Sequence, residues 1–376
     1  DAVLPQIAAA LADRGTAVLV APPGAGKTTR VPLALLQAPW RGDQRLIVLS
    51  PRRLAARTAA ERLAQQLGEA VGQTVGYRVR LDSKISAHTR IEVVTEGMFT
   101  RQVLGDPELQ GVAAVLFDEF HERSLEGDLG LALARDVQQG LREDLRLLVM
   151  SATLDGARIS RLLGDAPVIE SAGRAFPVAF RYLGRPPQGQ RIEEAISAAV
   201  GQAMRQQDGS ILVFLPGQGE IERCARLLQE QAWGPGVVIC PLYGALDAKA
   251  QELAIAPAPA GQRKIVLATT VAETSLTIEG VTVVIYSGLT RRPRFEPASG
   301  LTRLETVRVS QAAATQRAGR AGRLGPGVCY RLWDEAENRA LVPFDKPEIL
   351  DADLTGLMLD LAAWGVSSGS GLAFLD

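Results

Sequence analysis

Short apolar runs alternate along this chain with longer stretches in which apolar residues recur every three or four positions. That alternation is typical of parallel α/β units, in which buried strands and amphipathic helices follow one another. In the first half it predicts strands at 17–20, 45–49, 91–95, 113–118, 145–150 and 168–170. Helices are predicted to begin at Lys27, near Arg53, at Glu96, near Leu125 and after Asp155.

A Gly/Pro-rich stretch at 184–189 interrupts this pattern, and we expect the link between two domains there or just before it. The pattern then restarts, with predicted strands at 211–215, 237–240, 264–269 and 281–286 and helices at 218–229 and 247–254. The sequence therefore predicts two α/β halves in tandem. Further on, Leu354, Leu357, Met358 and Leu361 mark one face of a helix that stops at Gly365. One helix cannot form a domain, so we expect residues 343–376 to be the truncated start of a third unit.

Composition changes this picture only a little. The 376 residues are 47% hydrophobic and carry 41 basic against 42 acidic side chains, for a net charge of −1. A surface that binds polyanions everywhere is thereby excluded, and any nucleic-acid contact must come from local basic clusters. No apolar run is long enough to span a membrane. Three cysteines without CxxC spacing and only two histidines argue against a zinc site or a disulfide framework and favour a reducing cytoplasm.

The loop after the first predicted strand carries a strong chemical signal. Residues 21–29 read APPGAGKTT, and a glycine-containing loop between a strand and a helix is the context that a P-loop requires. Its backbone N–H groups point at phosphate, while Lys27 neutralises phosphate charge and the Thr28 hydroxyl binds Mg²⁺. Ala21 replaces the first glycine of the motif, which costs little if its φ is negative. The predicted nucleotide-binding residues of the loop are Gly24, Ala25, Gly26, Lys27, Thr28 and Thr29.

The predicted strand at 113–118 ends in two carboxylates. Ligands of parallel sheets bind at the carboxyl ends of strands, so Asp118 is expected to hold Mg²⁺, partly through water. Glu119 is expected to orient or deprotonate an attacking water, and His121 is a candidate for coupling the γ-phosphate to the second half of the chain. The alternative is that the two carboxylates only cap the following helix. Kinases and GTPases share this combination, so the second half must distinguish them.

Three arginines in the second half make that distinction. Arg317, Arg320 and Arg323 lie three residues apart, which places them on one face of a helix or helix end. Alanines and glycines between them would let a phosphate-bearing partner approach closely. Such arginines can act as fingers on a transferring phosphoryl group, and the alternative is a solvated basic helix face.

Together these residues resemble the DEAH-box branch of the superfamily-two helicases, and within it the bacterial HrpB-type proteins. The P-loop is similar to motif I, and residues 118–121 (DEFH) are similar to motif II with Phe in the third place. Residues 316–323 match motif VI in full. The remaining motifs, Ia, Ib, III, IV and V, are resembled in family order by residues 50–56, 95–98, 151–153, 211–217 and 270–277.

This resemblance implies two RecA-like domains, at 1–172 and 173–342, followed by the truncated start of a winged-helix-like unit at 343–376. It implies that ATP binds between the two domains, with Arg320 and Arg323 as the finger pair and Gln316 beside the catalytic water or the γ-phosphate. It further implies that Arg62 stacks on the adenine. Glu279 stands where the family usually has Asp in motif V, and Ile255 stands where an aromatic residue often completes the adenine site, so nucleotides besides ATP are expected to be used.

The resemblance also implies a track for single-stranded nucleic acid, RNA favoured over DNA, with 3′→5′ translocation. Guanidinium, hydroxyl and backbone N–H groups suit phosphate and sugar contacts, which position a strand without reading its sequence. Residues 294–304 predict a hairpin with a Pro/Ser/Gly turn, which either lies beside the strand or is a plain edge hairpin. The expected contacts are Arg52, Arg53, Thr95, Gly97, Thr270, Thr274, Arg294 and Arg303.

Three functions stay open at this point. The leading one is an ATP-dependent helicase that works as a monomer. A small-molecule kinase or GTPase is disfavoured by the arginine motif and by the second α/β half. A nucleotide-gated binding or remodelling ATPase that never unwinds a duplex fits the same motifs.

Overall fold

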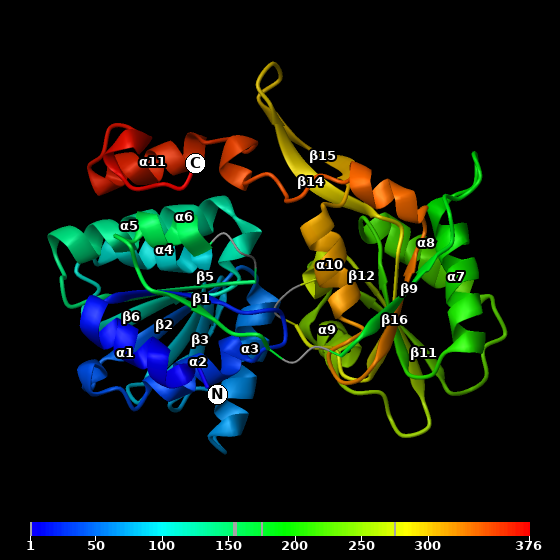
Figure 1. The fold of residues 1–376 in the computed structure, drawn as a ribbon, viewed down its shortest axis with the longest axis horizontal. Coiled ribbons are helices and arrows are strands. Elements are labelled where there is room, and N and C mark those ends of the chain that lie inside the picture. Colours follow the sequence, from blue (N-terminus) through cyan, green and yellow to red (C-terminus); the bar gives the residue numbers. More distant parts are fainter. Residues whose placement is uncertain (1, 153–155, 174–175, 274–275) are drawn as a thin grey trace. The chain divides into compact units, whose positions relative to one another are not determined.

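The chain divides into two compact α/β units. A computed structural model describes residues 2–152, 156–173, 176–273 and 276–376 (Figure 1). The first unit comprises Asp1–Gly173 and Lys346–Asp376, and the second comprises Arg174–Asp345. The boundary between the units lies before the Gly/Pro-rich stretch 184–189, which belongs to the second unit. The reason is strand β9 (Val178–Tyr182), which precedes it and pairs in parallel with β16 (Gly327–Arg331) of the second sheet.

The first unit is a sheet in the order β4-β3-β5-β2-β6-β7-β1-β8, parallel except for the β3–β4 pair. All six strands predicted in this half are present. Its strands are β1 (Thr16–Val20), β2 (Arg45–Ser50), β3 (Val75–Val79), β4 (Asp82–Lys84), β5 (Ile91–Thr95), β6 (Val112–Phe117), β7 (Arg146–Ser151) and β8 (Val168–Glu170). Its α-helices are α1 (Leu4–Arg14), α2 (Lys27–Leu35), α3 (Arg53–Gln66), α4 (Glu96–Gly105), α5 (Leu125–Gly140), α6 (Gly156–Leu162) and α11 (Thr355–Trp364). Short 3-10 turns occur at Pro39–Arg41, Phe120–Glu122, Glu348–Leu350 and Gly369–Gly371.

Helices cover both faces of this sheet. In β1, Leu19 packs into a core cluster with α1, α2 and α3, whereas Val18 packs into a second cluster with α4, α5 and α6. Successive side chains of a strand point to opposite faces, so a strand buried on both faces needs a continuous apolar run. That run is what made these strands recognisable in the sequence.

The second unit is a sheet in the order β11-β12-β10-β13-β16-β9 with parallel neighbours. The other strands are β10 (Ser210–Phe214), β11 (Val237–Leu242), β12 (Arg263–Ala268) and β13 (Val281–Tyr286), and a separate antiparallel hairpin consists of β14 (Leu289–Glu296) and β15 (Leu301–Arg308). The hairpin predicted at 294–304 is thus confirmed and extends further at its base. The α-helices are α7 (Ile192–Gln206), α8 (Gln218–Gln229), α9 (Ala248–Ile255) and α10 (Gln311–Gly319), with 3-10 turns at Thr270–Ala272 and Glu335–Ala340.

The C-terminal segment packs on the first unit. Leu357 and Leu361 of α11 are buried in the core cluster of α4 and α5, and the indole Nε1 of Trp364 donates to Asp136 Oδ2 at 2.8 Å. The Glu348 carboxylate accepts a hydrogen bond from the backbone N–H of Leu125 at 2.8 Å, at the first residue of α5. Helix α11 ends at Gly365 as predicted, because φ is 93° there and glycine adopts this left-handed conformation without a side-chain clash.

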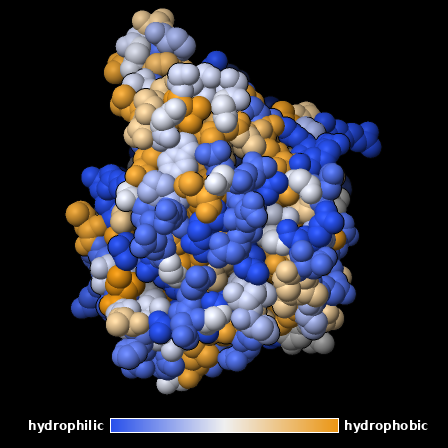
Figure 2. Space-filling view, turned by 90° about the vertical axis from the view of Figure 1, so that its left-hand side faces the viewer, coloured by the Kyte–Doolittle hydropathy of each residue, from blue (hydrophilic) through white to orange (hydrophobic). Residues whose placement is uncertain are grey.

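Within the described ranges, no helix combines the length and the apolar character needed to cross a bilayer. The face shown in Figure 2 is mostly hydrophilic, with hydrophobic residues scattered among the charged ones. Scattered exposed apolar residues are ordinary for a protein surface.

Candidate functional site

The loop after β1 has the backbone of a phosphate cradle. Gly24 and Gly26 have φ of 86° and 80°, and Gly26 is the left-handed N-cap from which α2 begins at Lys27. A side chain at either glycine would be strained, so these two positions require glycine. Ala21 is not among the described residues with positive φ, and its N–H donates to the carbonyl of Ser151 at 2.9 Å. The alanine in place of the first glycine is therefore tolerated without strain.

Four side chains come together beside this loop, two from the start of α2 and two from the end of β6. The Lys27 ammonium lies 2.9 Å from Glu119 Oε2, and the Thr28 hydroxyl donates to Asp118 Oδ2 at 2.5 Å. Lys27, Asp118 and Glu119 are 5%, 3% and 4% exposed. The site thus holds two carboxylates and one ammonium with little access to water, and its buried charges carry a net excess of one negative charge.

Burial disfavours the ionised form of Asp118. The loss of hydration, reinforced by the neighbouring Glu119 carboxylate, raises the pKa of Asp118 to about 7, against the opposing effect of Lys27. A divalent cation would supply the missing positive charge. The Thr28 hydroxyl and the Asp118 carboxylate are adjacent oxygen donors of the kind Mg²⁺ prefers, so the donor set fits this ion. No cluster of three or more His, Cys, Asp or Glu side chains that could hold a metal occurs among the residues placed by the structure.

His121 connects the acidic strand end to the end of β7. Its Nδ1 accepts a hydrogen bond from the backbone N–H of Ala152 at 3.2 Å and lies 3.5 Å from Glu119 Oε2. An Nδ1 that accepts this bond carries no proton, so the neutral ring is protonated at Nε2. The strand end itself turns sharply, because Glu119 has φ of 52°. Thr153, the last residue of the segment that resembles motif III, lies outside the described residues.

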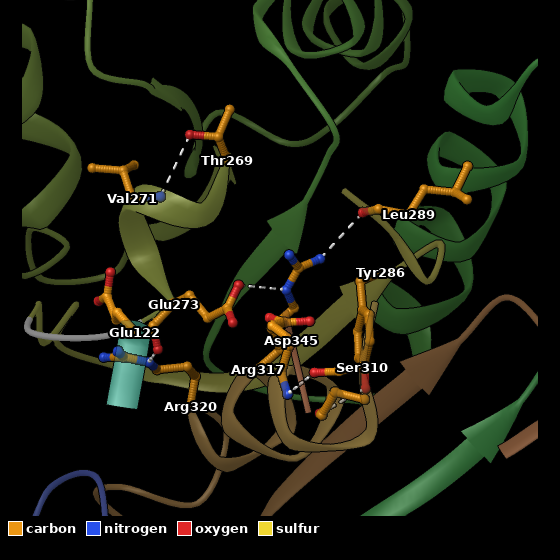
Figure 3. A network of polar contacts seen from close by, with 12 residues as sticks. Glu122, Thr269, Val271, Glu273, Tyr286, Leu289, Ser310, Arg317, Arg320 and Asp345 are labelled. Atoms are coloured by element: carbon orange, nitrogen blue, oxygen red, sulfur yellow. Dashed lines mark hydrogen bonds and ion pairs between the residues drawn. The ribbon is translucent and has the colours of Figure 1, made fainter. Parts of the chain in front are cut away.

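The arginines of the second unit converge on the segment after β12, as Figure 3 shows for Arg317 and Arg320. The Nε of Arg317 donates to Glu273 Oε2 at 2.9 Å, and Arg320 donates from Nε to the Glu273 carbonyl at 2.8 Å and from Nη1 to the Leu276 carbonyl. Arg323 donates to the Leu276 carbonyl at 3.0 Å. Backbone carbonyls therefore hold the two proposed finger residues.

The arginine segment extends past the end of its helix. Arg317 lies within α10, which ends at Gly319, Arg320 is the C-cap, and Arg323 lies beyond it, yet all three donate to the segment after β12. One of the small residues between the arginines, Gly322, is required by the fold. A Cβ on Gly322 would lie 2.5 Å from the carbonyl oxygen of Phe176, so the glycine is required by the chain's own backbone.

The predicted nucleic-acid contacts of the first unit lie at the carboxyl ends of neighbouring strands. Ser50 of β2 pairs with Thr95 of β5, which brings the starts of α3 and α4 to the same edge of the sheet. Arg53 is exposed, whereas Arg52 forms an ion pair with Glu122 at 2.8 Å. Thr95 is the N-cap of α4, and Gly97 is close to the Glu126 carboxylate.

In the second unit, Thr270 begins the 3-10 turn after β12, and Thr274 lies outside the described residues. Arg294 and Arg303 face each other directly across the hairpin and are exposed. Each also has an acidic neighbour, because Arg294 lies 3.2 Å from Glu305 and Arg303 lies 3.4 Å from Glu296. The hairpin is therefore a mixed charged surface rather than a purely basic one.

The remaining predicted residues lie in different elements and differ in how exposed they are. Arg62 is a half-buried residue of α3, Gln316 is half-buried in α10, and Glu279 is exposed in the loop before β13. Ile255 ends α9. Their predicted roles at the nucleotide stay predictions.

Two family comparisons agree with this geometry. Residues 3–162 match the DEAD/DEAH box helicase family, and residues 191–325 match the helicase conserved C-terminal domain. The chain belongs to the DEAD/DEAH box helicase family. The resemblance drawn from the motifs is thereby confirmed.

Among relatives of this helicase family, the chain is 52% identical over 375 residues to the ATP-dependent RNA helicase HrpB of Escherichia coli (strain K12). It is 37% identical over 366 residues to the pre-mRNA-splicing factor ATP-dependent RNA helicase prp22 of Schizosaccharomyces pombe. These matches cover 100% and 96% of this chain but 46% and 31% of the two relatives, so the chain spans less than half of their length.

Solved structures give the same fold. The crystal structure of Escherichia coli DEAH/RHA helicase HrpB matches with a TM-score of 0.93 and 52% identity, over 100% of this chain and 48% of that one. A structure of E. coli DExH-box NTPase HrpB matches with a TM-score of 0.86 and 52% identity, over 100% of this chain and 46% of that one. The two units are RecA-like domains, as the sequence predicts.

One residue of the helicase site escaped the sequence reasoning. Glu273 is buried and holds both Arg317, through its carboxylate, and Arg320, through its carbonyl. It is the one acidic residue in segment 270–277, which reads TVAETSLT. A lone carboxylate in a segment without other charges is the signal that would have pointed to it.

Proposed function

We propose that this chain is the ATP-driven motor of an RNA helicase, moving 3′→5′ on a single strand as ATP is hydrolysed. The observation that carries the proposal is the buried cluster of Lys27, Thr28, Asp118 and Glu119 at the mouth of a glycine loop. The names of the relatives support ATP and RNA as the ligands. Because the chain spans less than half of those relatives, the activity of the whole protein is part of the proposal.

The first unit would bind and activate the nucleotide. The loop N–H groups and Lys27 bind the phosphates, while Thr28 and Asp118 hold Mg²⁺, Asp118 partly through water. Bound Mg²⁺ neutralises the charge that develops on the phosphoryl oxygens. Lys27 is paired with Glu119 at 2.9 Å, so phosphate that attracts Lys27 releases the Glu119 carboxylate to orient or deprotonate the attacking water. His121, whose ring is fixed by Ala152, transmits the state of this site toward β7.

The second unit would complete the reaction. Arg320 and Arg323 act as the finger pair on the γ-phosphate, with Gln316 beside the catalytic water, and Arg62 and Glu279 at the base and ribose. The guanidinium groups of Arg320 and Arg323 are already fixed by carbonyl oxygens, so little reorganisation is needed when charge develops on the phosphate. Such fingers contribute roughly 10³–10⁵ in rate. We propose that ATP draws the two units together and that hydrolysis releases them, so that they grip the strand alternately.

The strand would lie along the residues that end β2, β5 and β12. Arg52, Arg53, Thr95, Gly97, Thr270 and Thr274 offer guanidinium, hydroxyl and N–H groups for phosphate and sugar, and Arg294 and Arg303 extend this surface along the hairpin. Arg52 is held by Glu122 at 2.8 Å, so a phosphate must displace that carboxylate. Binding should therefore be dominated by phosphate contacts and weaken steeply with salt.

The test is the rate of ATP hydrolysis with RNA, with DNA and with neither, repeated across salt concentrations. RNA should stimulate the wild-type chain, and Lys27→Ala and Glu119→Gln should each abolish that stimulation. Normal turnover in both variants would refute the assignment of the site. Phosphate transfer from ATP to a metabolite, at a rate that neither nucleic acid changes, would favour a kinase instead.

A remodelling ATPase that never unwinds a duplex is the second candidate. The observation in its favour is the hairpin, whose exposed arginines each have a carboxylate neighbour rather than forming a purely basic wedge. A strand-displacement assay separates the two candidates: RNA-stimulated hydrolysis without displacement, in this chain and in the intact protein, would favour the remodelling ATPase. Cytoplasmic location and a monomeric state stay predictions.

A further inference from the structure

Arg331, the last residue of β16, is buried in a cage of aromatic rings. Its guanidinium carbon lies 4.4 Å from the ring centre of Phe180, 5.7 Å from Tyr182, 5.8 Å from Tyr286 and 5.2 Å from Trp333, and the residue is 7% exposed. A buried cation is costly unless its environment compensates for lost water, and aromatic faces supply part of that compensation. An aliphatic residue would fill the same space at lower cost, so the cage alone does not explain an arginine.

The hydrogen bonds of Arg331 show what its charge holds. Within the described part of the chain, its guanidinium donates to neutral oxygens: from Nε to the Tyr286 hydroxyl at 2.9 Å and from Nη1 to the Tyr182 hydroxyl at 3.1 Å. The Tyr286 hydroxyl in turn donates to the carbonyl of Ala314 at 2.8 Å. Arg331 Nη2 is also within 3.5 Å of that carbonyl. Both groups therefore act on one carbonyl oxygen of α10.

Ala314 lies in the middle of the helix that carries the arginine segment. It is one turn before Arg317 and two turns before Arg320, the C-cap residue of α10. Tyr286 also contacts Phe214, with ring centres 6.4 Å apart, and Phe214 lies under the Arg317 guanidinium at 5.0 Å. The close-up in Figure 3 shows Tyr286 standing beside the Arg317 side of this helix. The cage thus contacts α10 at the carbonyl of Ala314 and, through Phe214, at Arg317.

We propose that Arg331 and Tyr286 are positioning residues for the finger pair, fixing the rotation of α10 so that Arg320 and Arg323 meet their carbonyl partners. This rests on the proposed function, because it assigns the fingers to hydrolysis. Neither residue touches the nucleotide in this role. Tyr286 fixes the middle of α10 through one hydrogen bond, and Arg331 holds the Tyr286 hydroxyl in the orientation that makes it.

Tyr286→Phe is the sharpest variant, and Tyr182→Phe is its matched control. Each removes one hydroxyl that accepts from Arg331, but only the Tyr286 hydroxyl reaches α10. We expect Tyr286→Phe to lower kcat for RNA-stimulated ATP hydrolysis by about 3- to 10-fold, which corresponds to the net free energy of the one hydrogen bond that fixes α10. KM for ATP should stay within about 2-fold, and Tyr182→Phe should leave kcat within about 2-fold. Thermal unfolding of both variants checks that the fold is intact.

A double-mutant cycle with Arg320→Ala separates positioning from a general loss of rigidity. If Tyr286 acts through the finger, Tyr286→Phe should lower kcat no further in the Arg320→Ala background. Equal kcat losses in Tyr286→Phe and Tyr182→Phe, additive effects with Arg320→Ala, or wild-type kcat in Tyr286→Phe would each overturn the inference. Wild-type hydrolysis by Arg320→Ala itself would instead overturn the proposed finger, which keeps the two failures distinguishable.

Discussion

The nucleotide-free first unit should become more stable when Asp118 loses its charge. Asp118→Asn keeps the shape of the side chain: its amide oxygen can accept from the Glu119 N–H, now 2.9 Å from Oδ1, and its amide nitrogen can donate to the Thr28 hydroxyl. The substitution leaves Lys27 and Glu119 as a balanced pair. It removes the second of the two buried carboxylate charges beside Lys27.

The expected magnitude follows from the pKa of Asp118. Burial raises that pKa from 3.8 to about 7. At a pH between these two values, the carboxyl therefore takes up a proton when the chain folds. The stability that such a carboxyl contributes is fully present below its pKa in the unfolded chain. This contribution is lost progressively as pH rises to its pKa in the folded chain. About three pH units correspond to a ceiling of roughly 4 kcal/mol, at about 1.4 kcal/mol per unit. Imperfect replacement of the hydrogen bonds reduces this, so we expect a gain of about 1–3 kcal/mol, or about 2–12 °C in Tm, at pH 8.

The assay is thermal unfolding of the nucleotide-free chain between pH 5 and pH 8. The gain of Asp118→Asn over wild type should be near zero at pH 5 and should grow toward pH 8. Mg²⁺ should stabilise the wild type at pH 8 but not the variant. Asp144→Asn is the control with the opposite sign, since a hydrogen bond from Arg142 lowers the pKa of that exposed carboxyl. A variant that is destabilised equally at pH 5 and pH 8 would refute the reasoning, because Asp118 would then be ionised and well compensated throughout.

Three further outcomes follow from individual contacts. Gly322→Ala should destabilise the second unit by about 1–3 kcal/mol, because the added Cβ would lie 2.5 Å from the Phe176 carbonyl oxygen. Gly319→Ala is the control and should not destabilise it, because a Cβ there meets nothing within 4 Å. Denaturant unfolding compares the two variants. Burial raises the pKa of Glu96 from 4.5 to about 8, so the stability gain of Glu96→Gln over wild type should be smallest near pH 4.5 and should grow until about pH 8; a gain that does not change over this range would contradict a raised pKa. Arg52→Ala should weaken RNA binding and lower the salt slope by about 1, measured by fluorescence anisotropy; an unchanged slope would remove Arg52 from the phosphate contacts.

How far the sequence predicted the fold depended on where each strand lies in its sheet. Central strands such as β1 and β6 are buried on both faces, and their apolar runs are visible without any structure. Strand β4 reads Asp-Ser-Lys, and β9 is mostly exposed. Strand β16 ends in the charged Arg331. These strands form because they pair with a neighbouring strand, and the pattern of apolar residues along the sequence does not show such pairing.

The candidate site divides in the same way. The residues at Lys27, Thr28, Asp118 and Glu119 were predictable because strand ends and glycine loops are local patterns. The partners of Arg320 and Arg323 were harder to predict, since they include the carbonyl oxygens of Glu273 and Leu276 as well as the Thr277 hydroxyl, and a carbonyl carries no residue signature. At Gly322 the sequence could not show which neighbour requires a glycine. A nearby backbone and a nearby ligand both exclude a side chain, and the structure places the Phe176 carbonyl there.

The two units handle buried charge in opposite ways, and each way suits its part of hydrolysis. In the first, two buried carboxylates lie beside Lys27 and burial raises the pKa of Asp118, so its ionised form carries an electrostatic cost that Mg²⁺ can relieve. That cost favours binding of the cation with its nucleotide. In the second, Arg320 donates to backbone carbonyl oxygens and Arg331 donates to tyrosine hydroxyls. These contacts orient the two guanidinium groups, and a group that is oriented in advance is better placed to stabilise negative charge that appears only in the transition state.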